Sequence, residues 1–122
     1  MKHLVTWVSI TSSDFDRAVK FYSTTTGKDL KVQGEGDGRM ATSLSDEEMK
    51  EGVVGFGVSG DSTIMPGSNG PRVYLYVDID SFLSKVEEVG GKILTPRSSM
   101  GDYGDWALIE DSEGNHIGLH QI

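Results

Sequence analysis

The sequence contains no cysteine among its 122 residues. This absence excludes disulfide bonds, thiolate nucleophiles and cysteine-ligated zinc. Long apolar runs are missing as well, because no stretch approaches the roughly 18 residues that a membrane-spanning helix needs. The N-terminus also shows no charged segment followed by an apolar one, as a secretory leader would. We therefore expect a cytoplasmic protein with no membrane partner.

Positive charge is scarce too. The chain has 11 Lys and Arg against 19 Asp and Glu, a formal net charge of -8 at pH 7. Nucleic acid requires clustered basic side chains on its partner, so we expect no nucleic acid to bind. The length suffices for one hydrophobic core but not for two independent ones. Residues 1–122 are therefore predicted to form a single domain.

One segment in the second half has the pattern of a strand followed by a helix. In RVYLYVDID, residues 72–80, apolar side chains alternate with polar or aromatic ones, which is the period of a strand. From Phe82 onward apolar residues recur at helical spacing. Asp80 or Ser81 is the expected N-cap of this helix, and the pair Gly90 and Gly91 its end.

The N-terminal segment repeats this pattern. A β-branched strand runs through Ile10, and a helix with an apolar face begins near Phe15. Ser13 or Asp14 is the expected N-cap, and Gly27 the end of the helix.

A shift of 64 residues superposes the two segments. The matched pairs include Asp14 with Asp78, Gly27 with Gly91 and Leu30 with Leu94. We treat the chain as two copies of one βαβββ module, about residues 1–62 and 72–122, joined by a turn-rich linker at 63–71. The remaining strands are expected at 30–33, 40–44 and 53–58, and at 92–94, 106–109 and 116–120. Because one such module leaves a sheet face unburied, the two together predict an α+β fold. Its curved mixed sheet surrounds a concave cup, with the helices on the outer face.

Two motifs connect this pattern to a known family. A βαβββ pair with SSDFDRAVKFY after the first strand and DSEGNHIGL before the last resembles the vicinal oxygen chelate superfamily. That superfamily includes glyoxalase I, extradiol dioxygenases, methylmalonyl-CoA epimerase and the bleomycin-resistance proteins. The resemblance covers essentially the whole chain. It implies the fold and a homodimer, but no particular reaction.

The metal-dependent members of that superfamily carry four ligands in the cup, usually His, Glu or Gln, His and Glu. The resemblance places Trp7, the segment GFGV at residues 55–58, Arg72 and Gly118 at those positions. None of these residues offers a side chain that binds a metal. We therefore expect no metal, no cofactor and no assigned catalytic residue.

The two histidines near the C-terminus do not replace the missing ligands. His116 and His120 lie four residues apart in a predicted strand. At the rise of a strand their Cα atoms are separated by roughly 13 Å, which is too far to share one ion. His116 is expected near a turn and His120 at the end of the strand.

Strand parity predicts what lines the cup instead. If Val73, Leu75 and Val77 face the helices, the side chains between them face inward. The predicted binding residues are Trp7, Ser9, Arg72, Tyr74, Tyr76, Trp106, Leu108 and His120. Aromatic walls with one cation and a few polar groups suit a small organic ligand with an anionic or planar group.

The leading hypothesis is a metal-free, glyoxalase-like protein that binds such a molecule. One alternative is an enzyme of the same superfamily, a lyase, isomerase or dioxygenase. It would depend on a divalent metal or work without one through Arg72, Tyr74, Tyr76 or His120. The other alternative is a structural or regulatory module whose aromatic side chains fill the cup as core. SDEEMKEG lacks the spacing of a calcium loop, and its Ser45 and Glu48 predict a capping box.

Overall fold

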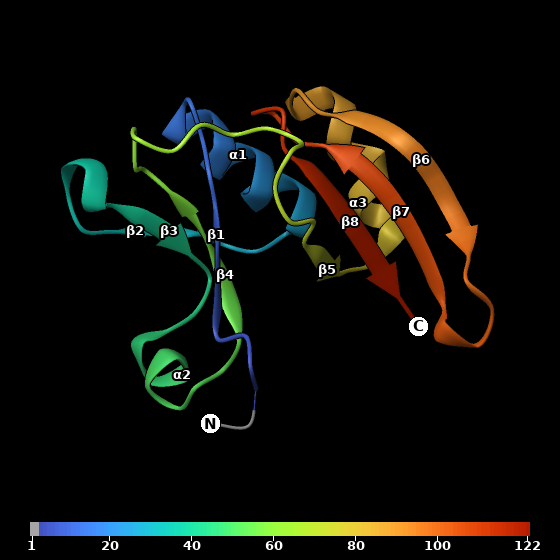
Figure 1. Cartoon of the computed structure of the whole chain (residues 1–122), viewed down its shortest axis with the longest axis horizontal. Coiled ribbons are helices and arrows are strands. Elements are labelled where there is room, and N and C mark those ends of the chain that lie inside the picture. The colour runs from blue at the N-terminus through green and yellow to red at the C-terminus, as the bar shows by residue number, and fades with distance from the viewer. Residues whose placement is uncertain (1–2) are drawn as a thin grey trace.

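The computed structural model describes residues 3–122, so the first two residues of the predicted first module lie outside the described part. The strands form two four-stranded sheets of the same internal order (Figure 1). The first sheet contains, in order, β1 (Trp7–Ile10), β4 (Gly55–Ser59), β3 (Met40–Thr42) and β2 (Lys31–Gln33). The second contains β5 (Tyr74–Tyr76), β8 (His116–Gln121), β7 (Asp105–Glu110) and β6 (Lys92–Ser99). In each sheet one pairing is parallel, β1 with β4 and β5 with β8, and the others are antiparallel. The predicted α+β class is confirmed.

Helices connect these strands and cover one face of each sheet. The α-helices are α1 (Phe15–Thr26), α2 (Asp46–Lys50) and α3 (Ile79–Val86), and the 3₁₀ turns are η1 (Gly36–Gly38), η2 (Glu87–Val89) and η3 (Gly101–Tyr103). No helix within residues 3–122 is both long and apolar enough to cross a membrane.

The helices begin at side chains that accept a backbone hydrogen bond. Asp14 accepts from the N–H of Arg17 at the start of α1, which confirms one of the two predicted caps. Asp78 accepts from the N–H of Ser81 at 3.1 Å, so the expectation of a cap at Asp80 or Ser81 was wrong. The chain is already helical at Ile79, whose side chain is fully buried.

The capping box at the start of α2 is present in full. The side chain of Ser45 accepts from the N–H of Glu48, and the Glu48 carboxylate accepts from the N–H of Ser45. Both N–H groups lie at the start of the helix, where backbone donors have no intrahelical acceptor. The capping box therefore stabilises a short exposed helix.

Strand β6 runs five residues beyond the predicted end at Leu94. Within the added stretch Pro96 has no N–H to donate to a partner strand. β6 is an edge strand, and its register with β7 shifts between Ile93 and Thr95 and again between Thr95 and Ser98. Pro96 therefore lies in an irregular stretch of an edge, where a missing donor costs little.

The hydrophobic core lies between the helices and the covered faces of both sheets. Phe21 of α1 and Phe82 of α3 pack edge to face with ring centroids 6.3 Å apart, and both side chains are buried. The same buried cluster takes Val58 from β4 and Leu119 from β8. The two halves of the chain thus share one core.

A buried carboxylate joins the two halves at the surface of this core. The turn between β7 and β8 places Glu113 against the start of α1, with its side chain 0% exposed. Its oxygens accept from the backbone N–H groups of Ser13 at 2.9 Å and Asp14 at 2.8 Å. The guanidinium Nε of Arg17 donates to it at 2.7 Å. The negative charge thus meets the positive end of a helix and a cation together.

A second set of hydrogen bonds lies beside the first. The hydroxyl of Tyr22 donates to Asp111 at 2.6 Å, and the amide Nδ2 of Asn115 donates to the carbonyl oxygen of Thr11 at 2.8 Å. Burial, followed by the neighbouring Asp111 charge, raises the pKa of Tyr22 well above its ordinary value. Tyr22 therefore stays neutral and keeps its proton to donate.

Protonation of Glu113 is opposed by its hydrogen bonds. Burial alone would raise the pKa of this carboxyl, but donation from Arg17, Asp14, Ser112 and Ser13 outweighs burial and lowers the pKa from 4.5 to about 2. Folding therefore favours the charged form, and the stabilisation amounts to about 3 kcal/mol.

We predict a loss of stability in acid that depends on Glu113. Because its pKa is lower in the folded chain, the contribution is complete above pH 4.5 and is lost as the pH falls towards about 2. Urea unfolding measured between pH 7 and pH 2 should show this loss. In Glu113→Gln the decrease in the free energy of unfolding between pH 7 and pH 2 should be smaller by about 3 kcal/mol.

Lys50→Gln serves as the control, since it neutralises an exposed charge on α2 without adding a carboxyl that titrates in the same range. Equal acid-dependent slopes in the wild type and Glu113→Gln would contradict the assignment.

Candidate functional site

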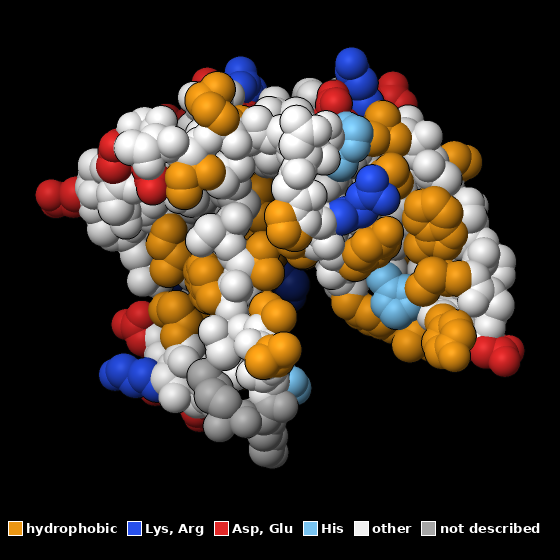
Figure 2. Space-filling view, in the orientation of Figure 1, with side chains coloured by type: hydrophobic (Ala, Val, Ile, Leu, Met, Phe, Trp, Pro, Cys, Tyr) orange, Lys and Arg blue, Asp and Glu red, His pale blue; other side chains and the backbone are white. Residues whose placement is uncertain are grey.

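One face of the second sheet collects five of the eight predicted binding residues. Alternate side chains of this sheet pack under the helices, and those between them point the other way. The uncovered side chains are Tyr74, Tyr76, Trp106, Leu108 and His120, which we call the aromatic face. Figure 2 shows hydrophobic side chains gathered with histidine and a basic side chain over the lobe that this sheet forms. In this sheet the alternate residues face away from the helices, as the alternation in the sequence predicted.

The residues of the aromatic face are in register across the strands. Tyr76 pairs with His120, and His120 in turn with Trp106, so these three form one row across the sheet. A second row runs from Tyr74 through Gly118 to Leu108. Tyr74 and Tyr76 are 49% and 66% exposed. The rings therefore offer their surfaces to solvent and to a ligand.

Tyr76 and His120 are held by contacts with their surroundings. Their rings pack edge to face with centroids 5.7 Å apart. The Nε2 atom of His120 lies 2.8 Å from the carbonyl oxygen of Tyr103, and since a carbonyl only accepts, Nε2 carries the hydrogen. The hydroxyl of Tyr76 accepts from the N–H of Ile122 at 3.2 Å. These contacts fix two rings at one end of the aromatic face.

In the first sheet Trp7 and Ser9 lie on the face away from the helices. Their neighbours Val8 and Ile10 pack toward the core. Trp7 is half-buried because its ring lies over Gly57 of β4, where an added Cβ would come within 2.7 Å of the Trp7 ring. Trp7 thus covers the centre of its sheet and leaves Ser9 exposed.

The second sheet repeats this arrangement of a ring over a glycine. An added Cβ at Gly118 of β8 would collide with the ring of Tyr74. Gly57 and Gly118 occupy the strands that pair with the first strand of each sheet. Each glycine is needed because an aromatic ring lies directly on its backbone.

The residues at the family's ligand positions do not fit a metal ion. Trp7, Arg72 and Gly118 offer no donor atom to a metal. The GFGV segment has no metal-binding side chain either, and its Gly57 lies under the ring of Trp7. Within residues 3–122 no three His, Asp or Glu side chains come together as a ligand set. His116 lies 3.4 Å from Glu110, which gives only a pair.

The eight predicted residues do not line one enclosed cavity. Tyr74 and Tyr76 border a cleft of about 710 Å³ between the two sheets, and Ser9 borders a smaller hollow of about 470 Å³. Arg72 is exposed just before β5, and neither hollow includes it. The structure thus brings five of the residues together on the aromatic face and leaves Trp7 and Ser9 on the other sheet.

Sequence reasoning missed the residues that line the larger cleft. Lys28, Leu44 and Phe56 contribute to it, although none of them shares the parity of the predicted cup. Lys28 follows α1 and Leu44 follows β3, both outside the strands, so a strand pattern carries no signal for them.

The family model for the Glyoxalase/Bleomycin resistance protein/Dioxygenase superfamily matches residues 3–119, and the chain belongs to this superfamily. This agrees with the resemblance seen in the sequence motifs. The family defines the fold and a shared architecture, whereas each member's reaction or ligand resides in its site.

Among curated proteins, the chain is 29% identical over 124 residues to "Putative glyoxylase CFP32" of Mycobacterium bovis. The match covers 94% of this chain but 44% of that protein, so the chain spans less than half the length of this relative. The Mycobacterium tuberculosis protein of the same name matches equally.

Solved structures share the fold over nearly the whole chain. A glyoxalase/bleomycin resistance protein from Albidiferax ferrireducens superposes with a TM-score of 0.74 at 17% identity, covering 98% of this chain and 99% of that one. TnmS3, an antibiotic binding protein from Streptomyces sp. CB03234, superposes with a TM-score of 0.67 at 28% identity, covering 99% and 96%. Glyoxalase I from Zea mays gives a TM-score of 0.70 at 20% identity, over 95% of this chain and 45% of that one.

We predict that Gly118→Ala displaces the ring of Tyr74 and lowers the free energy of unfolding by about 1–2 kcal/mol. The new methyl group needs the space that the ring occupies, and Tyr74 is exposed enough to turn away. Urea unfolding measures the loss, and ring proton shifts of Tyr74 report the displacement. Gly67→Ala is the matched control, since a Cβ there meets nothing within 4 Å.

The double variant Gly118→Ala with Tyr74→Ala tests the cause. Its loss should be less than the sum of the two single losses, because removing the ring relieves the collision. Additive losses would contradict the contact.

Proposed function

We propose that this chain binds a small, planar organic molecule on the aromatic face and does so without a metal ion. Tyr74, Tyr76 and Trp106 offer ring surfaces for stacking. Arg72 precedes β5 on the same side by parity and supplies a guanidinium for a carboxylate. His120 adds a polar group whose orientation is fixed by Tyr103.

The observation that carries the proposal is the pair of rings over glycines. At Gly118 the family's metal-dependent members present a ligand, and here the ring of Tyr74 lies there instead. The position at which the resemblance places a metal ligand thus contributes aromatic surface. Stacking on rings suits an organic ligand, whereas chelation requires oxygen or nitrogen donors.

Similarity to a binding protein supports the same conclusion. TnmS3 is described as an antibiotic binding protein, and the chain resembles it at 28% identity over nearly its whole length. We infer a ligand of the same broad kind, a small organic molecule. The relatives named as glyoxylases are more than twice as long, and their name leaves the reaction of this chain open.

We predict that planar aromatic carboxylates quench the tryptophan fluorescence and that a chelator does not change their affinity. Of the two tryptophans, Trp106 lies on the aromatic face and Trp7 on the first sheet. The quenching is therefore measured in Trp7→Phe, where Trp106 alone reports the proposed site. Arg72→Met should weaken binding of the acid about five- to tenfold but leave the corresponding amide unchanged. Lys50→Met, which removes an exposed cation on α2, is the matched control.

Elemental analysis of the purified chain completes this test. About one bound metal per chain, together with ligand binding that a chelator abolishes, would refute the metal-free proposal and favour the metal-dependent enzyme.

We further propose that a second copy of the chain covers the aromatic face and encloses the ligand. Tyr74, Tyr76 and Tyr103 are exposed large apolar side chains on one side of the second sheet. A cluster of this kind marks an interaction surface, and a stable dimer buries about 800 Å² on each partner. The exposed rings supply the apolar centre that such an interface needs.

We predict that light scattering after size exclusion gives the mass of a dimer. Tyr76→Glu should shift the chain toward the monomer, because it places a charge at the centre of the interface. Val32→Glu is the control, since Val32 is a comparably exposed strand residue, 55% against 66%, in the first sheet. A monomeric wild type, or dissociation by Val32→Glu alone, would contradict this interface.

The expected cytoplasmic location and the expected absence of nucleic-acid and membrane partners stay predictions from composition.

A further inference from the structure

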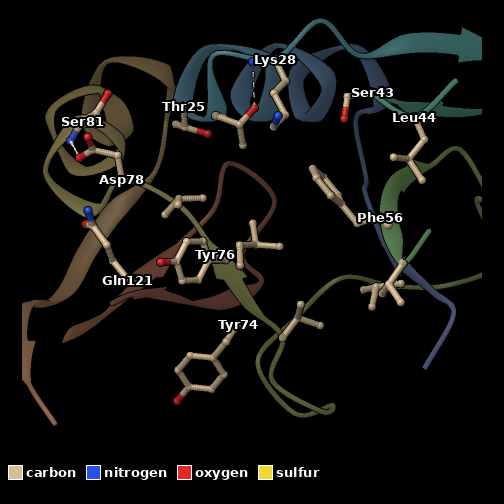
Figure 3. A pocket seen from close by; sticks show the side chains of 17 residues that line it. Thr25, Lys28, Ser43, Leu44, Phe56, Tyr74, Tyr76, Asp78, Ser81 and Gln121 are labelled. Carbon is tan, nitrogen blue, oxygen red and sulfur yellow. Dashed lines mark hydrogen bonds between the residues drawn. The ribbon is translucent and has the colours of Figure 1, made fainter. Parts of the chain in front are cut away.

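The cleft between the two sheets exposes part of the hydrophobic core. In the described part of the chain, β1 pairs with β4 alone and β5 with β8 alone, so both are edge strands. The cleft lies between these edges and has a volume of about 710 Å³ (Figure 3). Figure 2 shows the corresponding notch between the two lobes.

The walls of the cleft are side chains that pack against the core but remain partly exposed to solvent. Val8 and Phe56 come from the first sheet, and Leu75 and Val77 come from β5 and the residue after it. All four are partly buried members of the core's outer layer. Apolar side chains left facing water in a concave site are stabilised when an apolar molecule covers them.

One cation stands at the edge of this apolar surface. Lys28 follows Gly27, the left-handed C-cap of α1, and Figure 3 shows its side chain directed toward the cleft. It is the one basic residue among those that line the cleft, and within residues 3–122 its ammonium forms no ion pair. Ser43 adds a hydroxyl on the same side.

The one acidic residue of the cleft is already engaged. Asp78 lies on the opposite wall and caps α3 by accepting from the N–H of Ser81 at 3.1 Å. The positive end of the helix compensates its charge. The charge in the cleft that lacks a partner is therefore the ammonium of Lys28, and the complementary ligand is an anion.

We propose that this cleft is a second binding site, for an amphiphilic organic anion whose apolar body covers the exposed core and whose acidic group pairs with Lys28. The volume lies within the roughly 300–1,000 Å³ of small-molecule sites. This site is separate from the aromatic face, since Val8, Phe56, Leu75 and Val77 lie on the helix side of their sheets. Tyr74 and Tyr76 alone belong to both.

A pair of fluorescent probes with related aromatic bodies tests the proposal. The sulfonate 8-anilinonaphthalene-1-sulfonate carries the negative charge, and N-phenyl-1-naphthylamine lacks it. Both should bind the native chain. Lys28→Met should weaken the sulfonate about five- to tenfold and leave the neutral probe unchanged. Lys31→Met, which removes an exposed cation from β2 outside the cleft, should affect neither.

A second variant fills the cleft. Val54 lines it and is 42% exposed, so Val54→Trp adds bulk where the fold tolerates it. Binding of both probes should fall at least tenfold, while urea unfolding stays cooperative. Cooperative unfolding matters because these probes also bind partly folded chains.

Three results would overturn the proposal. One is unchanged sulfonate affinity in Lys28→Met. Another is a loss of sulfonate affinity in Arg72→Met but not in Lys28→Met, which would place the probe on the aromatic face. The third is loss of probe binding as the chain dimerises, which would mean that a second copy fills the cleft. A failure here leaves the proposed function intact, because the aromatic carboxylates are measured with different variants.

Discussion

The buried charge of Glu113 is the contact on which the mutual position of the two sheets depends. A carboxylate without water is unfavourable unless donors surround it, and here all of them except Ser112 come from the other half of the chain, from Arg17 and the start of α1. Phe21 and Phe82 bury apolar surface between the same two halves, but packing of that kind is not directional. The charged contact specifies which turn meets which helix end, and so where β1 stands relative to β5.

That fixed position explains both proposed sites. The helices and the contact of Glu113 with the start of α1 hold the sheets together on one side only. The uncovered faces and the edges of β1 and β5 therefore remain accessible. The aromatic face is an open surface that needs a second copy to enclose it, whereas the cleft is already concave within one chain. The proposal assigns stacking to the first site, and apolar contact with one ion pair to the second.

Local patterns in the sequence predicted what local physics determines. Alternation placed Tyr74, Tyr76 and Trp106 on one face, and the spacing of Ser45 and Glu48 predicted the capping box. The cap at Asp78 was missed, although its match with a predicted cap in the repeat pointed to it. The length of β6 depends on its irregular pairing with β7, and the cleft depends on contacts between distant segments. Periodicity carries no information about either.

The rings over Gly57 and Gly118 also bear on how this chain relates to its metal-dependent relatives. A histidine or glutamate introduced at Gly118 would meet the ring of Tyr74 before it could reach an ion. The same holds for Gly57 beneath Trp7. A metal ligand at Gly118 therefore requires the ring of Tyr74 to turn away from the sheet. The same backbone position can present either a ring surface or a chelating side chain, but not both at once.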